Sequence, residues 1–108
     1  MIELLKSELE SVLITLNAVN GDGKNVGLLH EKISLGLKRK GQRIFETVMP
    51  ELERYKKELG ECKGNESEIK ELNNEVVKFD VSKLSLSMIE EIESEYNYDF
   101  RIIEKIAE

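Results

Sequence analysis

The chain has 108 residues, of which 40% are hydrophobic and 35% are charged, and this size and composition are typical of one folded domain rather than of a disordered segment. The net charge is −6, and residues 55–108 carry 14 acidic and 8 basic side chains, whereas residues 1–54 carry 8 of each. This imbalance disfavours non-specific nucleic-acid binding by the whole molecule, because the acidic half repels phosphates.

The first segment, residues 2–19, has the spacing of an amphipathic helix. Its apolar residues are separated by gaps of three and four, which place them on one helical stripe. They are Ile2, Leu5, Leu9, Val12, Leu16 and Val19. Residues 20–23 (Asn-Gly-Asp-Gly) then predict a tight reversal, because these residue types tolerate left-handed backbone angles.

A second and longer helix is predicted over residues 25–59, where apolar residues again recur every three or four positions. Gly41 falls near the apolar face of this helix, and we expect its missing side chain to allow a close approach by the first helix. Pro50 lacks a backbone donor, so the helix is expected to kink there, or to stop and restart. Residues 60–65, which include Gly60 and Gly64, predict the exit from the helix.

The remaining segment is predicted to be mixed. Asn65 and Glu68 have the spacing of a helix cap, and Val77, Phe79 and Val81 alternate with charged residues as in a half-buried strand. We expect this strand to pair either with residues 83–86 or with another molecule. Two more helices are predicted, one that begins near Ser87 and a last one that contains Phe100, Ile103 and Ile106.

Together these elements predict a mainly α protein with a minor β element. A single domain, residues 1–108, would contain an antiparallel helical hairpin (1–59) with a long second helix, followed by a small mixed acidic C-terminal lobe (66–108). Apolar runs are too short to cross a bilayer, the first residues lack the pattern of a secretory signal, and the single cysteine cannot form an internal disulfide. We therefore expect a cytoplasmic location.

No pattern in the sequence predicts catalysis, a metal or a cofactor. His30 is the only histidine, and one histidine with one cysteine, Cys62, does not make a zinc site. Residues 20–31 partly fit a calcium-binding frame, but Lys24 replaces an oxygen ligand and Asn25 replaces the glycine of the turn. We expect a non-enzymatic protein with no cofactor, in which Cys62 has no chemical role.

The most specific feature is a basic stripe on the second helix. Lys32, Arg39 and Arg43 project within a narrow arc, and Lys38 and Lys40 lie close by, whereas the apolar residues centre on a direction more than about 90° away. The stripe fits a solvated helix face, a docking surface for an acidic protein surface such as the tail of a second copy, or a contact with nucleic-acid phosphates. No aromatic residue interleaves with it, so base stacking has no support.

The C-terminal half carries a resemblance. Residues 71–77 (Glu-Leu-Asn-Asn-Glu-Val-Val), then Asp80-Val81 and Leu84-Ser85, follow a Lys/Glu-rich hairpin, and this layout resembles a family of short tailed-phage proteins of uncharacterised function. The resemblance implies an accessory protein that acts in virion assembly or on a host component, in the host cytoplasm or associated with the virion. It supplies no catalytic residues.

Our leading interpretation is a non-enzymatic protein–protein interaction module that self-associates or binds a phage or host protein. Its candidate interaction residues are Lys32, Arg39, Arg43, Val77, Phe79 and Val81. The reasons are a second helix longer than the first can cover, a strand that needs a partner, and two regions of opposite charge. The alternative is a nucleic-acid-binding or regulatory protein that uses the basic stripe; no contact with a membrane is expected.

Overall fold

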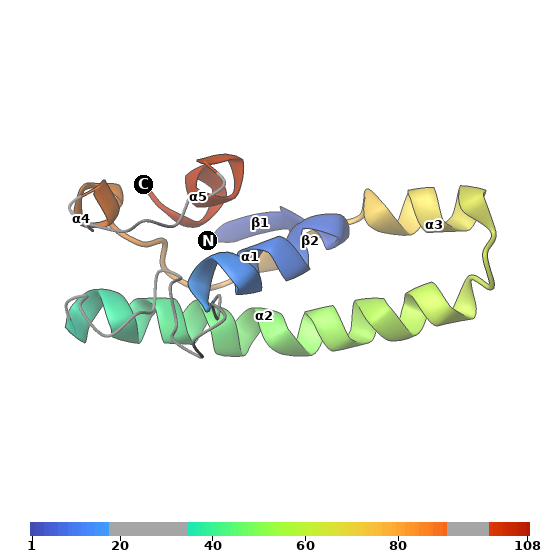
Figure 1. Cartoon of the computed structure of the whole chain (residues 1–108), viewed down its shortest axis with the longest axis horizontal. Coiled ribbons are helices and arrows are strands. Elements are labelled where there is room, and N and C mark those ends of the chain that lie inside the picture. Colours follow the sequence, from blue (N-terminus) through green and yellow to red (C-terminus); the bar gives the residue numbers. More distant parts are fainter. Residues whose placement is uncertain (18–34, 91–99) are drawn as a thin grey trace, which may run out of the picture.

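The computed structural model describes residues 1–17, 35–90 and 100–108. In chain order its elements are β1 (Ile2–Leu5), the short 3-10 helix η1 (Lys6–Glu8), α1 (Leu9–Leu16), α2 (Leu35–Glu61), α3 (Glu66–Asn73), β2 (Val76–Phe79), α4 (Leu86–Glu90) and α5 (Phe100–Ile106). Helices dominate, and the two strands form a small sheet (Figure 1). The predicted fold class, mainly α with a minor β element, is confirmed.

The long helix α2 is the axis of the molecule. It spans 27 residues, or about 40 Å at 1.5 Å per residue, and α1 lies against it and runs in the opposite direction (Figure 1). Its buried residues recur every three or four positions, as an amphipathic helix requires. They are Leu37, Gly41, Ile44, Val48 and Leu52. The buried position of Gly41 agrees with its expected place on the packed face.

Pro50 does not end the helix. It lies inside α2, which continues on both sides of it to Glu61. The predicted stop and restart is therefore wrong. The missing hydrogen bond is tolerated because Pro50 is exposed, while Val48 and Leu52 on either side are buried and hold the two halves of α2 against the rest of the protein.

The N-terminal segment corrects the prediction of one helix over residues 2–19. Residues 2–5 form β1 and only Leu9–Leu16 form an α-helix, while residues 18 and 19 lie outside the described residues. Ile2 and Leu4 are buried and Glu3 between them is exposed, so this short stretch also satisfies the two-residue period of a strand. The carboxylate of Glu8 accepts the backbone N–H of Leu5 at 2.8 Å and ends the strand.

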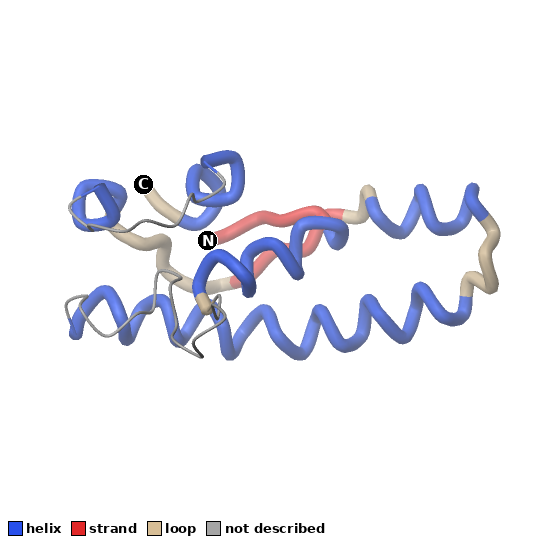
Figure 2. Tube along the Cα trace, in the orientation of Figure 1, coloured by secondary structure: helices blue, strands red, loops and turns tan. Residues whose placement is uncertain are grey.

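The partner of the predicted strand over residues 77–81 also differs from the expectation. β2 spans Val76–Phe79 and pairs antiparallel with β1, with Ile2 opposite Phe79 and Leu5 opposite Val76 (Figure 2). Neither residues 83–86 nor a second molecule is its partner here. Leu84 and Leu86 instead bond to the C-terminal end of the chain, through Ile106 and Glu108. Pairing with residues 83–86 was therefore wrong, because both segments find partners far away in the sequence.

The boundaries of the shorter helices follow from local chemistry. Lys63 and Gly64 adopt left-handed backbone angles, with φ of 49° and 79°, and they turn the chain away from α2 as predicted for residues 60–65. The side chain of Asn65 then accepts the N–H of Glu68 at 3.2 Å and caps α3. α4 begins at Leu86, slightly before the predicted start at Ser87, because the hydroxyl of Ser85 accepts the N–H of Met88. The last predicted helix is α5.

One apolar core joins the two predicted segments. It contains residues of β1, α1, α2, β2, α4 and α5, together with Leu84 and Ala107. The N-terminal strand thus completes the sheet of the C-terminal lobe, and the hairpin and the lobe share one interior rather than forming separate bodies. Within residues 1–17, 35–90 and 100–108, no helix is long and apolar enough to cross a membrane.

Candidate protein-interaction surface

The basic segment of α2, which we define as Lys38, Arg39, Lys40 and Arg43, lies on the surface. Arg39, Lys40 and Arg43 are exposed and Lys38 is half-buried. The intervening residues Leu37, Gly41 and Ile44 are buried, so the core fixes the helix that carries the charges. Lys32, the remaining member of the predicted stripe, lies outside the described residues.

These four cations form no ion pair with the carboxylates of the described residues. In the parts of the chain that the structure describes, their side chains also form no side-chain hydrogen bond, and α2 contains no acidic residue before Glu46. By contrast, Lys6 and Lys105 each bond to a glutamate. Among residues 1–17, 35–90 and 100–108, no carboxylate therefore pairs with the positive charge that the basic segment presents to solvent.

The opposite end of α2 meets α3 and forms an acidic cleft. Its volume is about 270 Å³, and its lining residues come from α2, the turn after it, α3 and the residue before β2. They are Glu58, Glu61, Cys62, Glu68, Glu71, Leu72 and Glu75. Five carboxylates thus converge at one end of the long axis, while the basic segment lies toward the other end (Figure 1).

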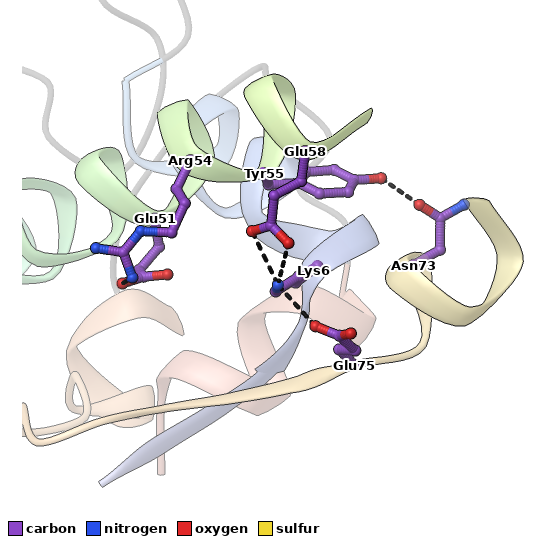
Figure 3. Close-up of polar contacts among 7 residues, drawn as sticks. All are labelled: Lys6, Glu51, Arg54, Tyr55, Glu58, Asn73 and Glu75. Carbon is purple, nitrogen blue, oxygen red and sulfur yellow. Dashed lines mark hydrogen bonds and ion pairs between the residues drawn. The ribbon is translucent and has the colours of Figure 1, made fainter. Parts of the chain in front are cut away.

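Lys6 holds the walls of this cleft together. Its ammonium lies 3.1 Å from Oε1 of Glu58 and 2.7 Å from Oε2 of Glu75, and only 12% of its side chain is exposed. Figure 3 shows Lys6 between the two carboxylates, and beside it the hydroxyl of Tyr55 bonded to the side chain of Asn73. The hydrogen bond to Glu75 raises the pKa of Lys6; burial opposes this, and Glu58 adds to it. The contacts of Lys6 tie η1 to α2 and to Glu75 just before β2, and the bond between Tyr55 and Asn73 ties α2 to α3.

Cys62 and Tyr55 are both poorly suited to ionise. Burial raises the pKa of the half-buried Cys62 thiol, and Glu68, Glu58 and Glu61 raise it further. Burial also raises the pKa of Tyr55, with a smaller effect from Glu10. Since the thiolate is the reactive form of cysteine, the environment of Cys62 suppresses nucleophilic chemistry.

The strand residues predicted to bind a partner belong to the hydrophobic core or pack against it. Phe79 is 4% exposed and belongs to the core, and Val77 and Val81 are half-buried and pack against it. Val77 and Phe79 share the core-facing side of β2, because side chains alternate between the two faces of a strand, and Val81 follows the end of β2. The exposed apolar residue of this strand is Val76, at 55%, which the sequence reasoning missed.

Sequence reasoning also missed the acidic cleft. A signal was present, because Glu58 and Glu61, and likewise Glu68 and Glu71, are three residues apart and share a helix face. The geometry of the turn between α2 and α3, which brings α3 back beside α2, could not be predicted from the sequence. The same reasoning found the exposed Arg39 and Arg43, since both belong to one helix.

The described part of the chain contains no cluster of the usual metal-binding side chains that could hold a metal ion. No group of three or more His, Cys, Asp or Glu side chains there has the arrangement of a metal site. His30 and the partial calcium-binding frame, residues 20–31, lie outside the described residues. The chain matches no protein-family model, no curated protein and no solved structure.

Proposed function

We propose that the protein is a non-enzymatic interaction module whose basic segment binds an acidic surface of a partner protein. The observation that carries this proposal is the set of four cations, Lys38, Arg39, Lys40 and Arg43, that project from a packed helix without ion pairs among the described residues. Such a patch attracts an opposite charge over about one Debye length. Lys32 extends the same stripe in sequence.

Two features favour a protein partner over a nucleic acid. No exposed aromatic side chain accompanies the basic segment in the described residues, since Phe45 is half-buried and packs against the core. Base stacking therefore has no platform. The acidic cleft at the other end of α2 would repel a phosphate backbone that follows the long axis of the molecule.

The biological setting of the proposal rests on the resemblance to short tailed-phage proteins. In that setting the partner is a virion or host protein, and the module acts in the host cytoplasm or within the virion. The mechanism is docking alone, with no cofactor: the rigid helix presents its charges, and the partner supplies carboxylates.

Site-specific photo-crosslinking in cells that produce the protein tests this proposal. A photoreactive residue replaces Gln42, which is exposed between Arg39 and Arg43, and the matched control replaces the exposed Glu104 of α5. We expect a discrete protein adduct at position 42 that is weak or missing at position 104. No adduct at position 42, or equal adducts at both positions, would contradict the proposal.

The same experiment distinguishes the proposed function from the alternative, which is nucleic-acid binding through the basic segment. Adducts that nuclease removes and protease does not would favour nucleic-acid binding. It also predicts binding to duplex DNA or RNA at about 50 mM salt that weakens steeply as salt rises, with a shallower slope after Arg39→Ala and Arg43→Ala. Absence of binding at low salt removes this alternative.

A further inference from the structure

Basic and acidic residues recur along one face of α2 at a spacing that makes the face complementary to itself. Lys40 and Glu58 are 18 residues apart, and so are Arg43 and Glu61. At about 3.6 residues per turn, 18 residues make about five full turns, so the members of each pair point in the same direction about 27 Å apart. The two directions lie about 60° from each other. This face, which we call the charged face, is positive at one end and negative at the other.

The charged face is open to solvent at Lys40, Arg43 and Glu61, whereas Glu58 is partly buried and also bonds to Lys6. A third of the Glu58 side chain is exposed. Between the two ends the face carries Thr47, Pro50 and Arg54. Arg54 already bonds to Glu51 at 3.0 Å, which reduces the positive charge at the centre (Figure 3).

We propose, building on the proposed function, that the partner of this face is a second copy of the same chain, packed antiparallel about a two-fold axis. Lys40 with Glu61, and Arg43 with Glu58, are both centred on the bond between Pro50 and Glu51. A two-fold axis at that point therefore places Lys40 level with Glu61 of the second copy and Arg43 level with its Glu58, and the long side chains bridge the difference of about 60° in direction within each pair. Each contact occurs twice, which gives four ion pairs in a closed dimer.

The acidic cleft adds to this attraction. The basic end of the second copy arrives where Glu58 and Glu61 border the cleft, and the other lining carboxylates are Glu68, Glu71 and Glu75. Among the described residues, Lys6 bonds to two of these carboxylates, Glu58 and Glu75, so its single positive charge leaves a net charge of −4 on the five carboxylates of the cleft. A basic residue of the second copy supplies positive charge that the described residues of the first copy do not provide.

Because exposed ion pairs are individually weak and screened by salt, the dimer is expected to be salt-sensitive. Between about 0.05 and 0.5 M NaCl the Debye length falls from roughly 14 Å to roughly 4 Å, and the dissociation constant measured by sedimentation equilibrium should rise by about tenfold or more. A chain that stays monomeric at low salt up to about 1 mM overturns the proposal.

A charge swap identifies the contact. Lys40→Glu alone, or Glu61→Lys alone, should weaken the dimer by about tenfold or more, because each sets like charges opposite each other at two places. The double variant K40E/E61K should recover it, as should an equimolar mixture of the two single variants. Neither Lys40 nor Glu61 takes part in the ion pairs of Lys6. Circular dichroism checks that each variant folds. The matched control is Lys56→Glu, which changes the charge on another face of α2.

The outcomes separate this inference from the proposed function. A dimer that Lys40→Glu leaves intact, or that K40E/E61K does not restore, overturns the antiparallel arrangement. A monomer whose position 42 still gives a crosslink to a different protein overturns self-association and leaves the proposed function standing. A carbodiimide crosslink between Lys40 of one isotope-labelled copy and Glu61 of an unlabelled copy would support the arrangement directly.

Discussion

Replacement of Lys6 by Met tests how far one partly buried ammonium stabilises the fold. The substitution keeps the apolar stem and removes the bonds to Glu58 and Glu75. A broken buried pair costs about 3–5 kcal/mol and a surface pair about 0.2–1 kcal/mol. The carboxylates are 33% and 55% exposed, so we expect a loss of about 1.5 kcal/mol, which lowers Tm by roughly 6–12 °C for a domain of this size.

Urea denaturation of Lys6→Met beside Lys56→Met measures this loss. Lys56 is exposed and has no ion pair in the described part of the chain, so its replacement should change stability by less than about 0.5 kcal/mol. Since folding raises the pKa of Lys6 above its ordinary value of 10.5, the stabilisation is complete below that pH and is lost as pH rises through the folded-state pKa. Equal stability of the two variants at neutral pH would refute the reasoning.

Three further predictions concern the core, a helix cap and the cysteine. Phe79→Ala should destabilise the protein by about 3–5 kcal/mol, because Phe79 is buried; a loss below about 1 kcal/mol in urea denaturation would contradict its place in the core. Asn65→Ala should cost about 1 kcal/mol through the lost cap of α3, whereas Asn65→Asp should be nearly neutral in the same measurement. The alkylation rate of Cys62 should keep rising above the pH at which a free cysteine ionises, because its pKa is raised, and a plateau at or below that pH would contradict this.

The sequence predicted those features that depend on one segment alone. The periodicity of α2 extends over many turns, so its buried face and its exposed Arg39 and Arg43 could be placed from spacing. The cap of Asn65 involves a residue only three positions away. Local chemistry also located the turn at Lys63 and Gly64.

Features that depend on distant segments could not be predicted. β1 was assigned to a helix because four residues fit both periods, and its partner β2 lies more than 70 residues away. The same distance made Phe79 look like a free interaction residue, although β1 and the core cover it. Lys6 and Glu58 are 52 residues apart, so neither their bond nor the cleft beside it was visible in the sequence.

The yield of the crosslink at position 42 tests the central claim most directly, when it is compared between two charge-reversed proteins. Arg39→Glu with Arg43→Glu reverses two of the three exposed charges of the basic segment, and Lys56→Glu with Lys57→Glu makes the same change in net charge elsewhere on α2. We predict that the protein adduct is lost only from the first protein. Equal yields from both would show that the basic segment does not recruit the partner.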